Sequence, residues 1–99
     1  LIQAAKSNNL TEATKQLQLG AQINPTAAHT TALIEACAQE GDNEKLVELL
    51  LESKADPNLP NKNLATPMHF AVQRDKDAVL TLLKRSGAEV GTQDKDGNT

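Results

Sequence analysis

The sequence repeats itself with a period of 33 to 34 residues. The segment LLLESKADPN at 49–58 recurs as LLKRSGAEVG at 82–91, and a degenerate copy, LQLGAQIN, occupies 17–24. Three alanines mark the same position in the copies, spaced 34 and then 33 residues apart: Ala21, Ala55 and Ala88. A period of this length is typical of solenoids, in which each unit buries its apolar face only against its neighbours.

A second landmark precedes the copies at 49–58 and 82–91 and helps to define helices. TPMHFA at 66–71 is echoed by TALIEA at 31–36, and DKDGNT at 94–99 reaches the same threonine again. Apolar residues at i, i+3 and i+4 predict an amphipathic helix before each Ala landmark, for example Leu46, Leu49 and Leu50. We predict helices at 1–7, 10–18, 32–40, 44–53, 67–74 and 77–85. Turn-rich fingers are predicted at 20–31, 54–66 and 87–98.

These landmarks resemble the ankyrin repeat, whose pattern reads D-x-x-G-x-T-P-L-H-x-A and then G-A-D-x-N. The resemblance covers nearly the whole chain and is best at 61–91. It implies an all-α fold: a solenoid of stacked helix–turn–helix units with β-turn or hairpin fingers. On this frame we expect a partial N-terminal capping repeat at 1–24, a repeat with a two-residue insertion at 25–58, a repeat at 59–91 and the start of a further repeat at 92–99.

Several residues differ from the repeat pattern, and two glycines stand where a helix end requires them. Ala32 replaces the motif proline and Ile34 the histidine, while His29 and Leu64 stand where the turn has glycine. A branched residue at positive φ costs roughly 1 kcal/mol or more, so the turn at Leu64 either changes type or stores strain. Glycines 20 and 87 follow the second helices, where a left-handed residue is expected.

The two ends of the array are expected to differ. Lys15 and Gln16 take the places of the paired leucines in the later units, which is typical of a terminal repeat with a polar outer face. The helix at 77–85 keeps an apolar set wide enough for two neighbours. We therefore expect that residues beyond Thr99 complete at least one more helix pair. The core is expected to bury Leu49, Leu50, Leu82 and Leu83.

Composition excludes several classes of function. The 99 residues carry a net charge of −3 and one aromatic residue, which excludes a strongly basic nucleic-acid binder and an aromatic platform for stacking bases. Cys37 is the only cysteine, so no disulfide can form within the chain and a structural zinc site is disfavoured. No apolar run approaches the roughly 18 residues of a membrane span, and no signal peptide is visible. A lone thiol fits a reducing compartment. We expect the cytoplasm, with the nucleus as the alternative.

Candidate catalytic groups have simpler structural interpretations. In its T-P-x-H context His69 is expected to hold the turn through nearby backbone or Thr66. Cys37 lies on a predicted inner helix and is expected to be a small buried hydrophobe. Glu44, Glu48 and Glu52 step by four residues along a solvated face. The run at 94–98 lacks the spacing and terminal glutamate of a calcium loop. We expect no catalytic residue, no metal site and no cofactor.

The resemblance implies a protein-interaction scaffold that binds a partner protein or peptide on its concave face. The finger tips and the exposed side of each first helix would form this face. We predict these partner-binding residues: Ala27, Ala28, Thr30, Ala38, Gln39, Lys62, Asn63, Ala65, Gln73, Arg74, Lys95, Asp96 and Asn98. Arg74 is the favoured anchor, because arginine is enriched at hot spots; the alternative is a surface pair with Asp75 or Asp77. The full-length protein is expected to be a monomer. The alternative function is a regulatory or substrate-recruiting arm of a larger enzyme.

Overall fold

The computed structural model describes residues 1–21, 23–24, 30–39 and 43–89, and in these ranges it is helical, with no strand. The helices are α1 (Ile2–Lys6), α2 (Leu10–Gln18), α3 (Ala32–Ala38), α4 (Glu44–Glu52), α5 (Pro67–Gln73) and α6 (Asp77–Arg85). Each lies inside the range predicted from sequence, and four of them are shorter by one or two residues. The predicted all-α solenoid is confirmed, whereas the repeat boundaries stay predictions.

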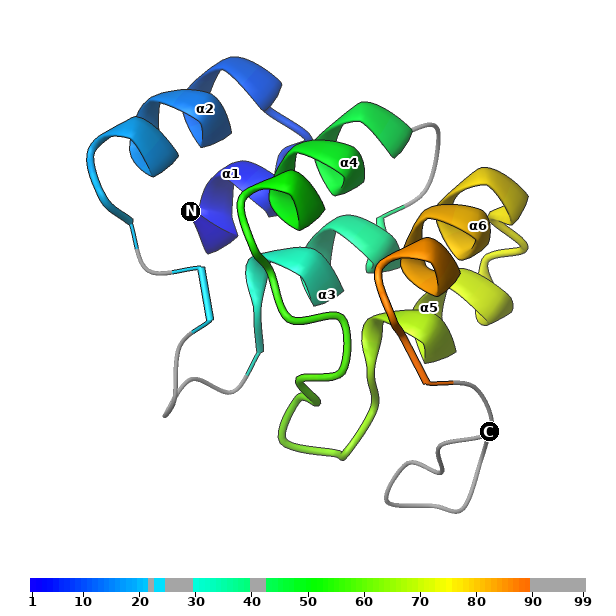
Figure 1. Cartoon of the computed structure of the whole chain (residues 1–99). Helices are drawn as coiled ribbons and strands as arrows, with labels where there is room; N and C mark the ends of the chain where they lie inside the picture. The colour runs from blue at the N-terminus through cyan, green and yellow to red at the C-terminus, as the bar shows by residue number, and fades with distance from the viewer. Residues whose placement is uncertain (22, 25–29, 40–42, 90–99) are drawn as a thin grey trace.

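The helices form three antiparallel pairs stacked side by side: unit one (α1 and α2), unit two (α3 and α4) and unit three (α5 and α6) (Figure 1). The first helices form an inner layer, in which α3 contacts both α1 and α5. The second helices form an outer layer, in which α4 contacts both α2 and α6. The connection between units two and three, residues 53–66, extends from the end of the layers as a finger (Figure 1).

Side-chain size sets the distance between these helices. The inner layer buries small residues completely, among them Ala5, Ala36 and Cys37, which lets neighbouring helices approach closely. The outer layer contributes fully buried leucines, with Leu50 and Leu83 at 0 % exposure. The prediction of a leucine core is confirmed for these two. Four leucines were predicted, and the other two are only partly buried at the edge of the core: Leu49 and Leu82.

The second helices end in the same way in all three units. After α6, the Gly87 N–H donates to the Lys84 carbonyl at 3.2 Å and the Ala88 N–H to the Leu83 carbonyl at 2.9 Å. This pair of bonds is a Schellman motif, which needs a left-handed residue after the helix. Gly87 supplies it at φ +92°, as Gly20 does at φ +88°, so the predicted role of these glycines is confirmed.

Lys54 occupies this left-handed position in unit two. Its φ is +75°, and its N–H donates to the Leu51 carbonyl at 3.1 Å. A side chain at positive φ is strained by roughly 1 kcal/mol. Because Lys54 is exposed, that strain is not offset by burial of the side chain.

We expect Lys54→Gly to raise the free energy of unfolding by up to about 1 kcal/mol. Strain relief is partly offset, since glycine also gives the unfolded chain more freedom. Urea unfolding measures the change. The matched control is Gly87→Lys, which should lower the free energy of unfolding by a similar amount. A Cβ at Gly87 meets no atom within 4 Å, so only its φ is penalised. Destabilisation by Lys54→Gly would contradict the expectation.

The finger before α5 stores strain at Leu64. The Asn61 side chain accepts hydrogen bonds from the Asn63 N–H at 2.9 Å and the Ala65 N–H at 3.0 Å. The Asn61 carbonyl accepts from the Leu64 N–H at 3.0 Å. These bonds hold Leu64 at φ +62° with its side chain 54 % exposed. Of the two possibilities raised by the sequence, the structure therefore shows a strained left-handed leucine.

Asparagines tie each finger base to the next unit. The Asn24 amide donates to the Lys54 carbonyl at 2.9 Å, and its oxygen accepts from the Asp56 N–H at 2.7 Å. Thirty-four residues later, the Asn58 amide donates to the Gly87 carbonyl at 3.1 Å, and its oxygen accepts from the Glu89 N–H at 2.8 Å. The same two-bond bridge thus joins units one and two and units two and three.

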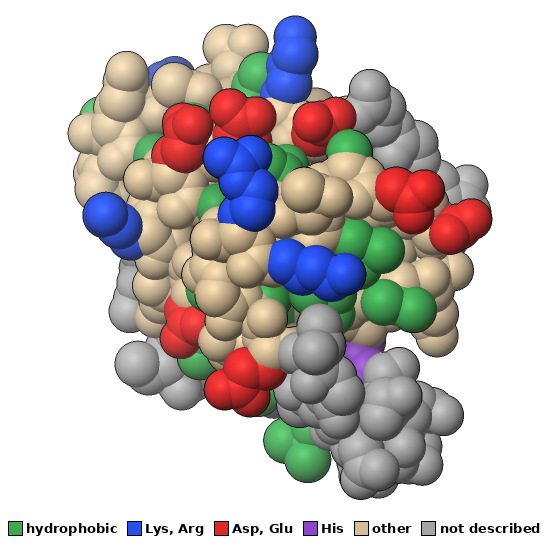
Figure 2. Space-filling model, turned by 45° about the vertical axis from the view of Figure 1, so that its right-hand side comes forward, with side chains coloured by type: hydrophobic (Ala, Val, Ile, Leu, Met, Phe, Trp, Pro, Cys, Tyr) green, Lys and Arg blue, Asp and Glu red, His purple; other side chains and the backbone are tan. Residues whose placement is uncertain are grey.

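One side of unit three is apolar and open. Ala5 in α1 and Cys37 in α3 are fully buried under the following unit, whereas Val72, at the equivalent position of α5, is 53 % exposed. Figure 2 shows apolar side chains among charged ones where α5 and α6 lie. The residues that the structure describes place no helix pair over this side. The exposed Val72 agrees with the expectation of a further unit, which stays a prediction.

Candidate functional site

The candidate site is the surface formed by the finger tips and the exposed side of the inner helices. Five of the predicted contact residues lie outside the described residues: Ala27, Ala28, Lys95, Asp96 and Asn98. The other eight lie in the fingers at residue 30 and at 62–65, or towards the C-terminal ends of α3 and α5. The structure therefore defines this surface best in unit three.

The described contact residues differ in how much side chain they offer. Lys62, Asn63, Gln73 and Arg74 are exposed. Three residues nearer to unit one are half-buried: Thr30, Ala38 and Gln39. Ala65 is only 8 % exposed, so it offers little side chain here, and its role as a contact residue stays a prediction. The Asn61 side chain accepts a hydrogen bond from the Ala65 N–H, which closes the loop, and the Ala65 methyl group is buried.

Leu64 is a part of this surface that sequence reasoning missed. It directly follows Lys62 and Asn63 and is 54 % exposed, so an apolar side chain lies beside a cation and an amide at the finger tip. The signal was present in the sequence, since leucine stands where the repeat pattern has glycine.

The turn below the finger is held by His69, as predicted. The Thr66 N–H donates to His69 Nδ1 at 2.9 Å, and the Thr66 hydroxyl lies 3.0 Å from the same nitrogen. Pro67 begins α5, and the pair forms a capping box. In unit two, Thr31 still caps α3 by accepting from the Ile34 N–H at 3.1 Å. Ile34 has no ring nitrogen to complete the box, so unit two keeps only half of it.

Cys37 is buried, and its surroundings favour the protonated thiol. It is fully buried, and this burial raises the pKa of its thiol to about 12, while the Lys76 ammonium lowers the pKa by a smaller amount. The prediction of a small buried hydrophobe is confirmed. A thiol with this pKa is protonated at neutral pH, whereas nucleophilic attack requires the thiolate.

The raised thiol pKa predicts a loss of stability in alkali. From pH 9 towards 12, the unfolded chain releases the Cys37 proton and the folded chain keeps it. The contribution of the protonated Cys37 thiol to the free energy of unfolding is fully present below pH 9. As the pH rises above 9, this contribution should be lost at roughly 1 kcal/mol per pH unit. Urea unfolding at pH 8.5 and 10 measures this loss, with Cys37→Ala as the control. An equal loss in the control would show that other groups cause it.

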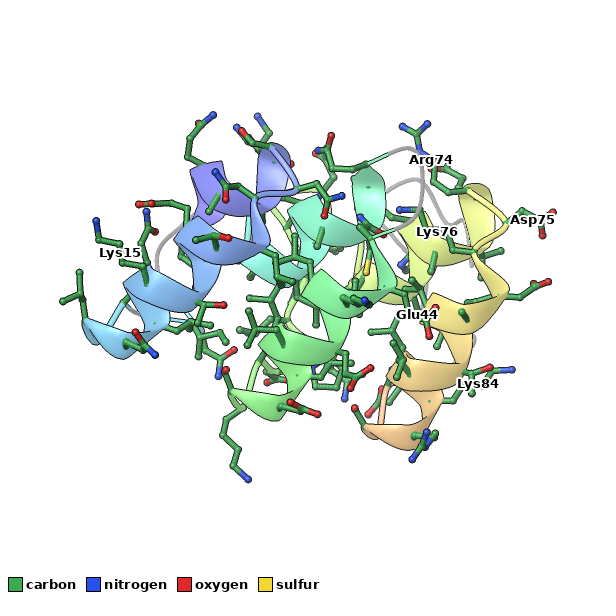
Figure 3. All side chains as sticks on the ribbon, turned by 90° about the horizontal axis from the view of Figure 1, so that it is seen from above. Lys15, Glu44, Arg74, Asp75, Lys76 and Lys84 are labelled. Carbon is green, nitrogen blue, oxygen red and sulfur yellow. The ribbon has the colours of Figure 1, made fainter. Side chains whose placement is uncertain are left out.

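A buried polar contact joins units two and three behind this surface. Asn43 is only 3 % exposed, and its amide donates to the Ala36 carbonyl at the end of α3. Lys76 reaches back from the turn before α6, donating from Nζ to Asn43 Oδ1 at 2.9 Å and to the Ala36 carbonyl at 3.4 Å. Figure 3 shows Lys76 and Glu44 near the same end of the stack, with Arg74 and Asp75 beyond them. The contact fixes unit three, and with it Arg74, relative to unit two.

The described residues of the site carry groups that can bind a partner. Among the described residues, no three His, Cys, Asp or Glu side chains gather closely enough to hold a metal ion. In the same ranges, no helix has the length and apolar character needed to cross a membrane. The exposed groups at the site are amides, cations and one apolar side chain.

Comparison with known proteins agrees with this architecture. The family model described as "Ankyrin repeats (3 copies)" matches residues 1–94. An ankyrin repeat, SAM and basic leucine zipper domain-containing protein 1 from Dasypus novemcinctus is 38 % identical over 92 residues, covering 90 % of this chain and 19 % of that protein. An E3 ubiquitin-protein ligase, KEG, from Arabidopsis thaliana is 31 % identical over 78 residues, covering 79 % of this chain and 4 % of the ligase. The chain thus spans about a fifth or less of these relatives.

Proposed function

This chain belongs to the ankyrin repeat family, and we propose that it is a scaffold whose concave surface binds a partner protein or peptide. Ankyrin repeats generally mediate binding between proteins and are not catalytic. The finer assignment of the surface rests on the residues of unit three. Four side chains in the finger and at the end of α5 are exposed there on a backbone fixed by capping and loop hydrogen bonds: Lys62, Asn63, Gln73 and Arg74.

The chemistry of these groups suggests the kind of partner. Lys62 and Arg74 favour acidic or hydrogen-bond-accepting groups, and Gln73 and Asn63 can pair with an extended main chain. Leu64 offers one exposed apolar contact. An extended acidic segment with an apolar residue opposite Leu64 would satisfy all of them. The observation that carries the proposal is the joint exposure of Gln73 and Arg74 at the C-terminal end of α5.

We expect Arg74→Ala to weaken binding of a partner captured with the full chain by about tenfold, as is common for an arginine hot spot. The captured partner is purified and its dissociation constant measured by calorimetry. The control is Lys15→Ala, which removes an exposed cation from α2 in the outer layer and should leave affinity unchanged. Unchanged affinity for Arg74→Ala and Gln73→Ala would refute the assignment of this surface.

A second proposal is that the chain is a recruiting or regulatory arm of a larger enzyme. It is favoured by the Arabidopsis relative, which is named as a ubiquitin ligase and is far longer than the matching region. The partner surface would then hold a substrate for a reaction carried out elsewhere in the parent protein. Activity assays on the parent protein with Arg74→Ala test this idea. An arm predicts loss of turnover for the recruited protein only, while a parent protein with no enzymatic activity would exclude it.

A further inference from the structure

A groove lies between α4 and α6 in the outer layer of the stack. It has a volume of about 320 Å³ and is lined by residues from both helices. They are Glu48, Leu51 and Glu52 from α4, with Leu82, Arg85 and Ser86 from α6. The groove shares no residue with the proposed concave site. It therefore needs an explanation of its own.

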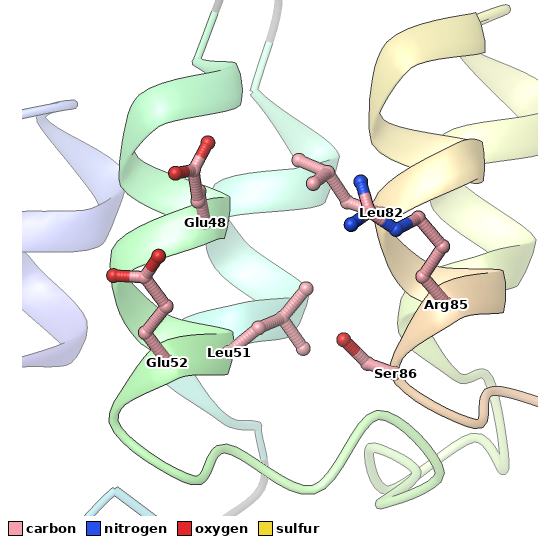
Figure 4. Close-up of a pocket in the computed structure, with 6 residues that line it drawn as sticks. All are labelled: Glu48, Leu51, Glu52, Leu82, Arg85 and Ser86. Carbon is pink, nitrogen blue, oxygen red and sulfur yellow. The ribbon is translucent and has the colours of Figure 1, made fainter.

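The two walls of the groove carry opposite charge over an apolar floor. Leu51 and Leu82 pack against the core but are only partly buried, so their outer atoms line the floor. Glu48 and Glu52 are exposed one helical turn apart on the α4 wall, and Arg85 is exposed on the α6 wall. Figure 4 shows the carboxylates on one side, the guanidinium on the other, and Leu51 between them.

Glu52 and Arg85 occupy equivalent positions of α4 and α6, 33 residues apart, so the charge at this position changes sign between unit two and unit three. In the part of the chain that the structure describes, no ion pair joins Arg85 to Glu48 or Glu52. Glu48, Glu52 and Arg85 thus line the groove without pairing with one another, and they can pair with charged groups of a bound segment.

We propose that this groove binds a short linear peptide segment that presents an apolar side chain between a basic and an acidic one. The apolar side chain would lie on Leu51 and Leu82, the basic group against Glu48 and Glu52, and the acidic group against Arg85. Two carboxylates against one guanidinium favour a segment with net positive charge. The volume is at the small end of ligand sites, which run from roughly 300 to 1,000 Å³, and fits one or two side chains.

A defined probe tests the proposal on the full chain. The probe is acetyl-Lys-Lys-Leu-Ser-Glu-amide, titrated against isotope-labelled protein at low salt. We expect saturable shifts of the backbone amide signals of Leu51, Glu52, Leu82 and Ser86. The Glu48→Lys/Glu52→Lys variant should bind at least tenfold more weakly, and added salt should weaken binding to the wild-type chain because exposed charges are screened.

Controls separate the groove from general charge effects. Glu89→Lys makes the same kind of charge reversal at an exposed residue beyond α6, and it should bind the probe as the wild-type chain does. Glu48→Gln/Glu52→Gln removes the charge with little change in helix propensity and should also weaken binding, which covers a failure of the double lysine variant to fold. Shifts confined to Gln73 and Arg74, equal binding by the charge-reversed variant, or no saturable shift would each overturn the proposal.

Discussion

Replacing Leu50 with alanine is expected to lower the free energy of unfolding by about 2–5 kcal/mol. Leu50 is fully buried in α4, which packs against both neighbouring outer helices. Truncation removes apolar surface from the core and leaves a cavity that rigid neighbours fill only partly. Because each unit is stabilised by its neighbours, a defect in the middle unit weakens both junctions. Urea unfolding of the full chain measures the loss.

The adjacent leucine is the matched control. Leu49→Ala deletes the same atoms from the same helix, but Leu49 is only partly buried, so its loss should be clearly smaller. The difference between the two variants then reports burial and not helix propensity, which is the same for both substitutions. Equal losses would mean that the buried face of α4 is assigned wrongly.

Asn43→Ala is expected to cost about 1–3 kcal/mol, although it removes no apolar surface. The substitution deletes the amide that donates to the Ala36 carbonyl and the oxygen that accepts from Lys76. A buried polar group that loses its hydrogen-bond partner still carries the free-energy cost of its removal from water. Thermal and urea unfolding should therefore show a loss far above that of a surface asparagine such as Asn63.

A double-mutant cycle isolates the contact between units. Asn43→Ala and Lys76→Met are measured singly and together, and a coupling energy of about 0.5–3 kcal/mol is expected for residues in direct contact. Lys76 is only half-buried whereas Asn43 is 3 % exposed, so Lys76→Met alone should cost less than Asn43→Ala. Additive losses would show that the bond between Asn43 and Lys76 contributes nothing to the docking of unit three.

Local features of this fold were predictable from sequence because local chemistry determines them. The helix ranges, the capping role of His69 and the left-handed glycines 20 and 87 each depend on residues within one turn or one helix. The repeat period then predicted that the helix pairs stack side by side. Leu64 was recognised as an unusual residue at a glycine position, but its exposure followed only from the loop geometry.

Features that depend on contacts between units were not predictable in this way. Lys76 meets Asn43 only after unit three has docked on unit two, and 33 residues separate them in the chain. Ala65 was expected on the surface because the repeat pattern places it in a finger. Asn61 closes that loop and buries it. The acidic residues of α4 were expected to be solvated. The exposed Glu48 and Glu52 confirm this, whereas Glu44 is half-buried. The position of Arg85 at the groove emerged only from the structure.

The asparagine bridges have a consequence for the sequence of any partner that lies across the fingers. Asn24 and Asn58 tie successive finger bases to the next unit with the same pair of bonds, so the described finger bases share the spacing of the packed helices. Packed helices lie roughly 8–10 Å apart, and an extended chain advances about 3.3 Å per residue. An extended partner would therefore pass one finger about every three residues. Its recognised side chains should recur at that interval, and inserting a single residue between two of them should shift one out of reach.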